Sequence, residues 1–308
     1  MRNFPFSIVF LLMFPHAVVS AATAENVLTL VNADPVVLVA GDVAQCNVRG
    51  AQLTANLVQQ MPDAVVLAPG DLAYENGSLK DFARCYDSSW GKFRDRTWTA
   101  PGNHEYGTPG ASGYFTYFGE RAGVPGKGYY SVNIGQWHVV SLNSNIAADE
   151  NSEQVAWLRK DLANYRATCI LAFWHHPRYS SGLHGSYRRM QTVWEVLHEH
   201  GASIVIGAHD HHYERFTLLD GQGKPVATRG IRSFVVGTGG ARLYDFGLRG
   251  KRSMAWHGAT WGMLKLTLRA DNYSWAFVSA QPTTFQDTGS SSCANKGADE
   301  NRIEPVDK

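Results

Sequence analysis

Three histidines fall within the eleven residues HHPRYSSGLHG, which span His175 to Gly185. An isolated histidine is usually an ordinary core or surface residue, although its neutral imidazole is also a common metal ligand. Four further apolar runs end at residue types that bind metals, namely Asp42, Asp71, Asn103 with His104, and His209 with His211. Residue types that bind metals thus stand at the ends of five apolar runs. Helix caps and turns alone do not readily explain all five, so these residues point to a metal centre.

The apolar runs that precede these residues have the length of β-strands. Helical periodicity separates some of them, in the segments Val48–Gln60, Ser152–Tyr165 and Ser186–His200. Continuous apolar strands with intervening helices favour sheets that are covered by helices. The runs GYYSVNIGQWHVVSLNS, IRSFVVGTGG and WGMLKLTLRADNYSWAFV predict antiparallel pairs, so we expect mixed sheets of the α/β class. In such sheets the ligands lie outside the carboxyl ends of the strands, where loops bring distant residues together.

Side-chain alternation restricts which histidines can share a metal. Neighbouring side chains of an extended strand point to opposite faces, so only one of His175 and His176 is expected to face a metal. The other should point elsewhere or contact a substrate pocket. The same alternation predicts that His209 and His211 face one side, with Asp210 turned away between them.

The ordered motifs GDVA, GDLAYENG, GNHEY, HHP and GAHDHHYER resemble those of the calcineurin-like metallophosphoesterases. Tyr74, three residues after Asp71, makes the chain similar to the purple acid phosphatase branch. The motifs run from Asp42 to Arg215, and the resemblance implies a catalytic domain over residues 35–279. It also implies a four-layer αββα sandwich of two mixed β-sheets flanked by helices.

The resemblance implies two metal ions. The residues that match the ligands of the first ion, Fe(III), are Asp42, Asp71, Tyr74 and His211. The second ion is Fe(II), Zn(II) or Mn(II), and its matching residues are the shared Asp71 together with Asn103, His175 and His209. Oxygen ligands with a phenolate suit a ferric ion, whereas imidazoles with an amide suit a divalent one. His175 is chosen over His176 because the family histidine lies two residues before proline. Ala208 departs from the pattern, which usually has glycine there.

The activity that the resemblance implies is hydrolysis of phosphate monoesters by metal-activated hydroxide, with a small phosphorylated substrate. His104 matches a histidine that acts on the developing charge or the leaving group, and His184 lies on a loop where relatives place a substrate-facing histidine. A phosphodiesterase or nucleotide hydrolase on the same centre is the alternative enzyme, because the surrounding loops set the preference. The non-enzymatic alternative is a secreted metal-binding protein with an inherited fold. Glu105, Arg178 and Tyr179 flank the site, where they could orient substrate, but exposed polar loop residues are the simpler interpretation of each.

Both ends of the chain have a distinct composition. Residues 1–22 contain one arginine, an apolar run from about Phe4 to Phe14 and then small residues, which predicts a cleaved signal peptide. We therefore expect a secreted or periplasmic protein without a stable membrane anchor, to be checked by N-terminal sequencing. Residues 284–308 are polar with little periodicity, which predicts a mostly loose C-terminal tail that Cys293 could tether.

Export favours disulfides among the four cysteines. We favour Cys46 with Cys85, since both follow strand-end loops in the N-terminal half, whereas Cys169 could instead be simply buried. The formal net charge is only +1 and no long basic run occurs, so no nucleic-acid partner is expected. The segment GTGGARLYDFG from Gly237 lacks the lysine of a phosphate-binding loop, which favours a turn that approaches the site.

Overall fold

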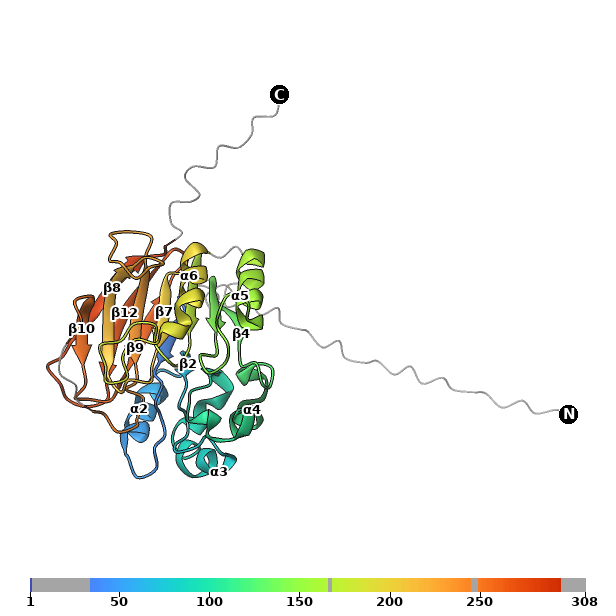
Figure 1. Cartoon of the computed structure of the whole chain (residues 1–308). Coiled ribbons are helices and arrows are strands. Elements are labelled where there is room, and N and C mark those ends of the chain that lie inside the picture. The colour runs from blue at the N-terminus through green and yellow to red at the C-terminus, as the bar shows by residue number, and fades with distance from the viewer. Residues whose placement is uncertain (2–33, 166–167, 245–248, 295–308) are drawn as a thin grey trace. The chain divides into compact units, whose positions relative to one another are not determined.

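The computed structural model describes Met1 and residues 34–165, 168–244 and 249–294. Within these residues the strands form two mixed sheets, and helices cover their outer faces (Figure 1). Of the proposed signal peptide, residues 1–22, all but Met1 lies outside the described part of the chain. No described helix has the length and apolar character that crossing a membrane requires.

The first sheet has six strands in the described residues. Their spatial order is β13 (Thr288–Ser292), β12 (Asn272–Ser279), β11 (Gly262–Leu268), β1 (Val36–Val39), β2 (Val65–Pro69) and β3 (Thr97–Ala100). β1, β2 and β3 pair in parallel, and β11, β12 and β13 extend the sheet in antiparallel fashion. The carboxyl ends of β1, β2 and β3 therefore meet at one edge.

The second sheet has seven strands among the described residues. Their spatial order is β10 (Ser253–His257), β8 (Tyr213–Leu219), β9 (Ile231–Val236), β7 (Ile204–Gly207), β6 (Cys169–Phe173), β5 (Trp137–Ser141) and β4 (Tyr130–Ile134). β5, β6, β7 and β9 are parallel to one another, whereas the pairs β4 with β5, β8 with β9, and β10 with β8 are antiparallel. Both sheets are thus mixed, as the sequence predicts.

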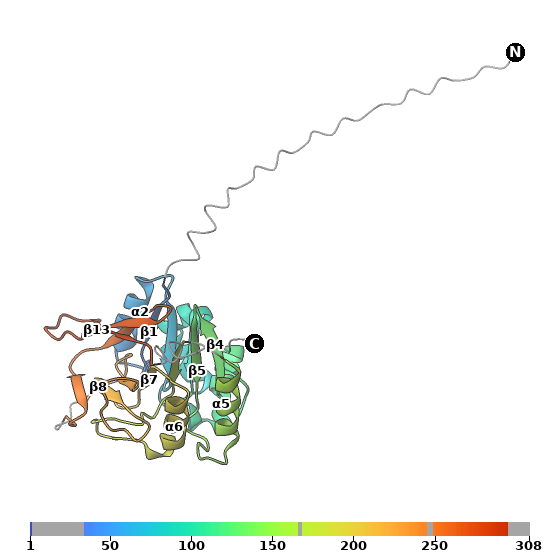
Figure 2. The same cartoon turned by 90° about the horizontal axis from the view of Figure 1, so that it is seen from above.

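Longer helices flank the sheets and short ones form the connections. The α-helices are α2 (Gly50–Gln59), α3 (Leu79–Asp81), α4 (Ser112–Phe118), α5 (Glu153–Asn164) and α6 (Gln191–Glu199). The shorter helical turns are η1 (Phe82–Tyr86), η2 (Trp90–Arg96), η3 (Glu105–Gly107), η4 (Pro109–Ala111), η5 (Gly119–Ala122) and η6 (Arg188–Met190). Figure 2 shows the layer order α2, β1, β7 and α6 from one side to the other.

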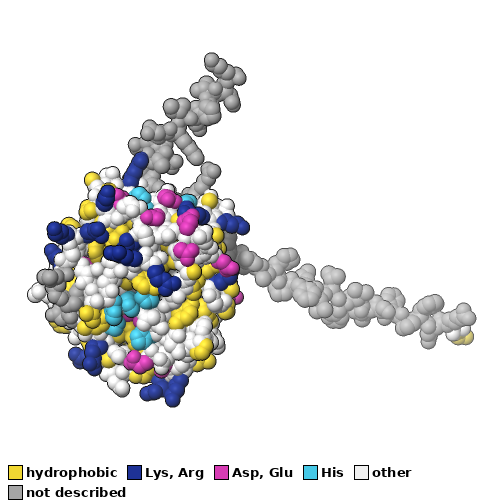
Figure 3. Space-filling view, viewed as in Figure 1, with side chains coloured by type: hydrophobic (Ala, Val, Ile, Leu, Met, Phe, Trp, Pro, Cys, Tyr) yellow, Lys and Arg dark blue, Asp and Glu magenta, His cyan; other side chains and the backbone are white. Residues whose placement is uncertain are grey.

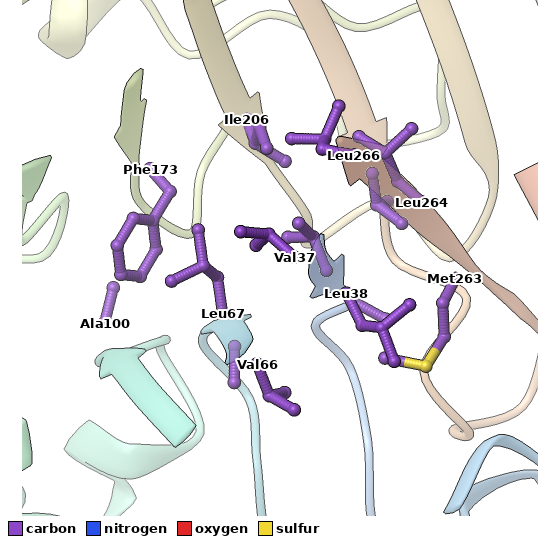
Figure 4. Packing of buried hydrophobic residues seen from close by; sticks show 14 of the residues in the cluster. Val37, Leu38, Val66, Leu67, Ala100, Phe173, Ile206, Met263, Leu264 and Leu266 are labelled. Carbon is purple, nitrogen blue, oxygen red and sulfur yellow. The ribbon is translucent and has the colours of Figure 1, made fainter. Parts of the chain in front are cut away.

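The core between the sheets explains why the strands are apolar on both faces. Phe173 of β6 and Ile206 of β7 face Val37 and Leu67 of the first sheet (Figure 4), and all four side chains are fully buried in one cluster. Leu38 points away from the second sheet, so each central strand buries both of its faces. Strands of this kind lie between covering layers, which produces continuous apolar runs.

The outer face of the second sheet packs against α5 and α6. Ala172 and Val205 lie in a separate buried cluster with Leu158 of α5 and with Val193 and Val196 of α6. The predicted apolar stripe of α6 is therefore confirmed. At its start α5 is capped by Ser152, whose hydroxyl accepts a hydrogen bond from the Val155 amide. The layers together form a four-layer αββα sandwich.

Disulfides join the four cysteines. The predicted pair, Cys46 with Cys85, is confirmed, and Cys169 is joined to Cys293 instead of being simply buried. The prediction of a loose tail from residue 284 is wrong at its start, because β13 pairs with β12 and Cys293 fixes its end. A strand at the edge of a sheet can be held by backbone hydrogen bonds without an apolar pattern. Residues 295–308 lie outside the described part.

Candidate metal centre

The predicted ligands follow β1, β2, β3, β6 and β7, whose carboxyl ends open toward the same region. The structure brings the side chains of all seven together there: Asp42, Asp71, Tyr74, Asn103, His175, His209 and His211. The sheet topology alone explains this meeting, because loops at the carboxyl ends of parallel strands converge. The atoms of these side chains that could bind a metal, the donor atoms, fall into two groups.

The first donor group consists of Asp42 Oδ1, the Tyr74 hydroxyl and His211 Nε2. The Tyr74 hydroxyl lies 2.9 Å from Asp42 Oδ1 and 3.2 Å from His211 Nε2. His211 Nε2 lies 3.3 Å from Asp42 Oδ1. Ligands that lie about 2.1 Å from one ion are roughly 3 Å apart from each other. The spacing of these three atoms therefore fits one shared cation.

The second donor group consists of Asn103 Oδ1, His175 Nε2 and His209 Nδ1. His175 Nε2 lies 3.1 Å from each of the other two atoms. Asp71 Oδ2 lies between the groups, 3.1 Å from His175 Nε2 and 3.5 Å from the Tyr74 hydroxyl. One carboxylate oxygen thus adjoins two sets of donors, which is the arrangement that two neighbouring cations with a bridging ligand require.

Backbone carbonyls orient two of the histidines. His175 Nδ1 lies 2.9 Å from the Pro69 carbonyl oxygen, and His211 Nδ1 lies 2.7 Å from that of Arg242. A carbonyl can only accept, so each Nδ1 carries a proton, which leaves Nε2 as the nitrogen that would turn a lone pair toward a bound cation. The glycine-rich segment from Gly237 therefore approaches the site, as predicted, and it supplies the acceptor for His211.

Three of the strand-end residues adopt a left-handed backbone conformation. The φ angles are 56° at Asp42, 52° at Asp71 and 67° at His209. Residues other than glycine rarely adopt such angles, and they persist where the surrounding structure fixes them. At His209 the backbone amide donates to Asp42 Oδ2 at 2.8 Å, which ties a loop of one sheet to a loop of the other.

Glu105 is a structural part of the site that the sequence interpretation placed at the surface. It is fully buried, and its carboxylate accepts hydrogen bonds from the backbone amides of Asp71, Leu72 and Gly102 at 2.7–2.8 Å. Burial and then the charge of Asp71 raise its pKa to about 7. The carboxylate joins the loops that carry Asp71 and Asn103. Its position directly after the Asn-His pair was the only sequence signal.

The charges of the buried side chains in the site change one another's pKa values. Burial alone would raise the pKa of Asp71, but His175 and His104 outweigh it and hold that pKa below its usual range. Burial alone would lower the pKa of His175, yet Asp71 and Asp42 raise it to about 9. Burial, then the charges of Asp42 and Asp71, raises the pKa of Tyr74 well above its ordinary value. Without a cation the Tyr74 side chain is therefore a neutral phenol.

His104 lies beside the donor groups without being part of them. Its ring centroid is 4.3 Å from that of Tyr74, and Nδ1 lies 2.5 Å from the Glu75 carbonyl oxygen. Because that carbonyl accepts the Nδ1 proton, Nε2 is left facing the site, 3.9 Å from Asp71 Oδ2. The backbone amide of His104 donates to Asp71 Oδ1 at 2.8 Å. His104 therefore has a backbone contact that orients Asp71 and a ring that is free for substrate.

His184 is exposed at the mouth of the site. Its ring centroid lies 4.4 Å from that of His209, and its backbone amide donates to Asp210 Oδ1 at 2.9 Å. Asp210 points away from the donor groups, as predicted, and fixes the loop that carries His184. Figure 3 shows histidine side chains gathered on this face of the molecule.

Two aromatic neighbours were not assigned a role from the sequence. His176 stacks near His209, with ring centroids 4.4 Å apart, and its Nδ1 lies 2.8 Å from the Ser144 hydroxyl. Tyr244 packs on His211 with centroids 4.7 Å apart and donates to the His209 carbonyl at 3.1 Å. His176 thus contacts the site from outside the donor groups, and Tyr244 buttresses the loop that carries two donors.

Close packing of the backbone explains why residue 102 is glycine. It also explains how Ala208 fits where the family motif usually has glycine. A Cβ at position 102 would lie 2.1 Å from Asp71 Oδ1, so only Gly102 leaves room for that carboxylate. A Cβ at position 41 would lie 2.6 Å from the Cβ of Ala208. The methyl group of Ala208 is therefore accommodated against a residue that has no side chain, and it does not displace His209.

The fold and this arrangement agree with the comparisons to known proteins. The model of the calcineurin-like phosphoesterase family matches residues 30–213, so the chain belongs to that family. Its curated relatives include purple acid phosphatases 15 and 18 of Arabidopsis thaliana, which supports the purple acid phosphatase-like branch. They are 32% and 28% identical over 199 and 228 residues.

The extent of these similarities is limited. The matches to purple acid phosphatases 15 and 18 cover 52% and 66% of this chain but only 37% and 49% of those proteins. The solved structure of the purple acid phosphatase PPD1 from yellow lupin (Lupinus luteus) seeds has a TM-score of 0.72 at 20% identity, and the match covers 84% of this chain and 53% of that one. The chain therefore spans about half the length of these relatives or less, and the structural likeness shows the fold.

Proposed function

We propose that this protein is an exported dinuclear-metal phosphatase that hydrolyses small phosphate monoesters. The observation that carries the proposal is the position of Asp71 Oδ2 between the two donor groups, 3.1 Å from His175 Nε2 and 3.5 Å from the Tyr74 hydroxyl. Two cations that both bind this carboxylate oxygen would neutralise a bound phosphate and lower the pKa of a coordinated water. The donor chemistry fits this use, since one group supplies a carboxylate and a phenol and the other an amide and imidazoles.

The residues of this chain would do the remaining work. Glu105 and the amide of His104 fix the position of Asp71, so the donor atoms are arranged before substrate arrives. His104 Nε2 faces the site, and in the imidazolium form, with the Nδ1 proton held by the Glu75 carbonyl, it is placed to give its proton to the leaving oxygen of the ester and become neutral imidazole. His184, exposed on its loop, is placed to donate a hydrogen bond to a phosphate oxygen.

A direct assay tests the proposed reaction. The purified, metal-loaded protein is expected to hydrolyse p-nitrophenyl phosphate with a kcat/KM at least about tenfold above that for the corresponding diester. Chelation should abolish both activities, and adding iron with zinc or manganese should restore them. A preference for the diester would replace the proposal with a phosphodiesterase. Inactivity toward both esters with two bound metals would identify a metal-binding protein without this chemistry.

The identity of the first metal can be tested through Tyr74. If Fe(III) is bound there, its positive charge offsets the effects that raise the pKa of Tyr74, and the resulting phenolate should give the protein a visible colour. Tyr74→Phe is expected to lose the visible band and to change kcat by less than about tenfold. Tyr244→Phe is the matched control and should keep the band, since that phenol bonds only the His209 carbonyl among the described residues. A colourless, fully active wild-type protein would contradict the ferric assignment.

A further inference from the structure

Two adjoining clefts lie next to the loop that follows β6. Their volumes are about 400 and 380 Å³, and they share Tyr179, Ser186 and Arg252. The described residues that line them include no carboxylate and four cationic side chains, which are Arg178, Arg188, Lys251 and Arg252. In a chain with a net charge of +1, this is a local concentration of positive charge.

Among the described residues, the four cations have no acidic partner, since none of them forms an ion pair with a carboxylate. The nearby carboxylates face neutral donors instead. Glu195 accepts from the side-chain amides of Gln191 and Gln222, both at 2.8 Å, and Glu214 accepts from the amide and hydroxyl of Ser181 at 2.9 and 2.6 Å. The positive charge of the clefts is therefore available to an anion.

Tyr179 holds two of the cations close together. The Arg178 guanidinium lies 4.3 Å from the Tyr179 ring centroid and that of Arg252 lies 5.2 Å from it. Arg178 Nε also donates to Gln191 Oε1 at 2.6 Å, which fixes its direction. Burial lowers the pKa of Arg178, Tyr179 and Glu195 raise it, and Arg188 and Arg252 lower it because these cations repel one another. A bound anion would relieve that repulsion.

The loop that lines the clefts also forms the metal centre. The Ser180 hydroxyl donates to Asp210 at 2.5 Å, and Asp210 lies between the two histidines His209 and His211. The ring of Tyr187, next to Arg188, stacks on His176 with centroids 4.6 Å apart. In Figure 3, Lys and Arg side chains border the gathered histidines on the same face. The clefts therefore adjoin the loop that carries His184 beside the donor groups.

We propose that the paired clefts bind a second phosphate group of the substrate, so that the preferred substrates are small molecules carrying two or more phosphates. This inference rests on the proposed phosphatase function, because it assigns the ester being hydrolysed to the metal centre and the other phosphate to the clefts. Arginine forks suit phosphate oxygens, and several unpaired cations favour a group of charge near −2 over a neutral one.

A series of alkane-diol bisphosphates of increasing length measures the preference. Each compound is compared with the matched monophosphate of the same diol, so that only the distal phosphate differs. The expected result is a KM for at least one bisphosphate that is about tenfold below that of its monophosphate, with a similar kcat, because one charge-assisted contact is worth about that factor. Equal KM values for every pair would overturn the inference.

Substitutions of single arginines then test whether the clefts cause the lower KM of the bisphosphate. Arg188→Gln and Arg252→Gln are expected to raise the KM of the best bisphosphate by about tenfold each and to leave the monophosphate KM and both kcat values within about twofold. Arg189→Gln is the matched control, since it removes the same charge one residue away from Arg188 and does not line either cleft. If Arg189→Gln acted as strongly as Arg188→Gln, a general positive field, and not the clefts, would explain the preference.

A binding measurement separates this inference from the proposed function. The non-hydrolysable alkane bisphosphonates are titrated calorimetrically against the full chain and compared with alkyl phosphonates of equal length. Tighter binding of a bisphosphonate, lost in Arg252→Gln, would support the clefts even if no ester were hydrolysed. Hydrolysis of monoesters combined with equal affinity for both phosphonates would retain the phosphatase and reject the second phosphate site.

Discussion

Asp71→Ala is expected to empty both proposed metal positions together and to lower kcat/KM for a phosphate monoester by at least about 10⁴-fold. Asp71 Oδ2 lies against donors of both groups, next to His175 Nε2 and the Tyr74 hydroxyl. Alanine offers no donor at this position. Loss of the Asp71 carboxylate also leaves the backbone amide of His104 without Oδ1, the atom that accepts its hydrogen bond.

Metal analysis of purified variants measures this effect. Asn103→Ala removes a donor from the second group alone and should retain one metal per chain, whereas Asp71→Ala should retain less than one. His184→Ala is the control, because its ring lies at the mouth of the site and should leave both metals bound. Circular dichroism establishes that each variant is folded. An Asp71→Ala protein that kept two tightly bound metals would disprove the bridging role.

His104→Ala is expected to lower kcat for an alkyl phosphate by about 10²- to 10⁴-fold, the usual contribution of a general acid, while both metals stay bound. Alanine keeps the backbone amide that donates to Asp71 Oδ1, so the position of the bridging carboxylate is preserved. Only the ring is lost, and its Nε2 lies 3.9 Å from Asp71 Oδ2, outside the close spacing of the donor groups.

The leaving group distinguishes acid catalysis from a structural effect. The loss in His104→Ala should be much smaller for p-nitrophenyl phosphate, since a good leaving group needs little protonation. Equal losses on both esters, or a metal content as low as that of Asn103→Ala, would show that the ring supports the centre instead. An unchanged kcat on the alkyl ester would direct the search for the acid to His184 or His176.

The parts of the fold that the sequence predicts well are those where packing controls residue type. Val37 and Leu67 lie between two sheets and Leu38 faces the opposite layer, so the strands must be apolar throughout. β13 could not be predicted in this way. It is an edge strand of Thr, Gly and Ser, held by backbone pairing to β12 and by the Cys169–Cys293 disulfide, and neither leaves an apolar pattern.

The candidate site, like the fold, contains residues that the sequence predicts and residues that it does not. Six candidate ligands could be identified because they stand at the ends of apolar runs, whereas Tyr74 was identified through the family resemblance, and the structure brings their donor atoms together. Glu105 could not be placed, because its burial depends on backbone amides of residues 71 and 102 that only the folded chain assembles. Tyr244 was missed for the same reason. Its contact with His211 joins segments that are about thirty residues apart in the sequence and on different elements.

If the site binds metal as proposed, the left-handed backbone at Asp42, Asp71 and His209 would link the abundance of this protein to the supply of metal. Each such residue costs about 1–3 kcal/mol of folding free energy, and two of the three bring buried carboxylates close together. Ions that bind only the folded chain would restore stability, by about 2.7 kcal/mol for one site at a hundred times its Kd. Metal-poor conditions would then lower the amount of folded protein as well as its activity, because cells degrade unfolded chains.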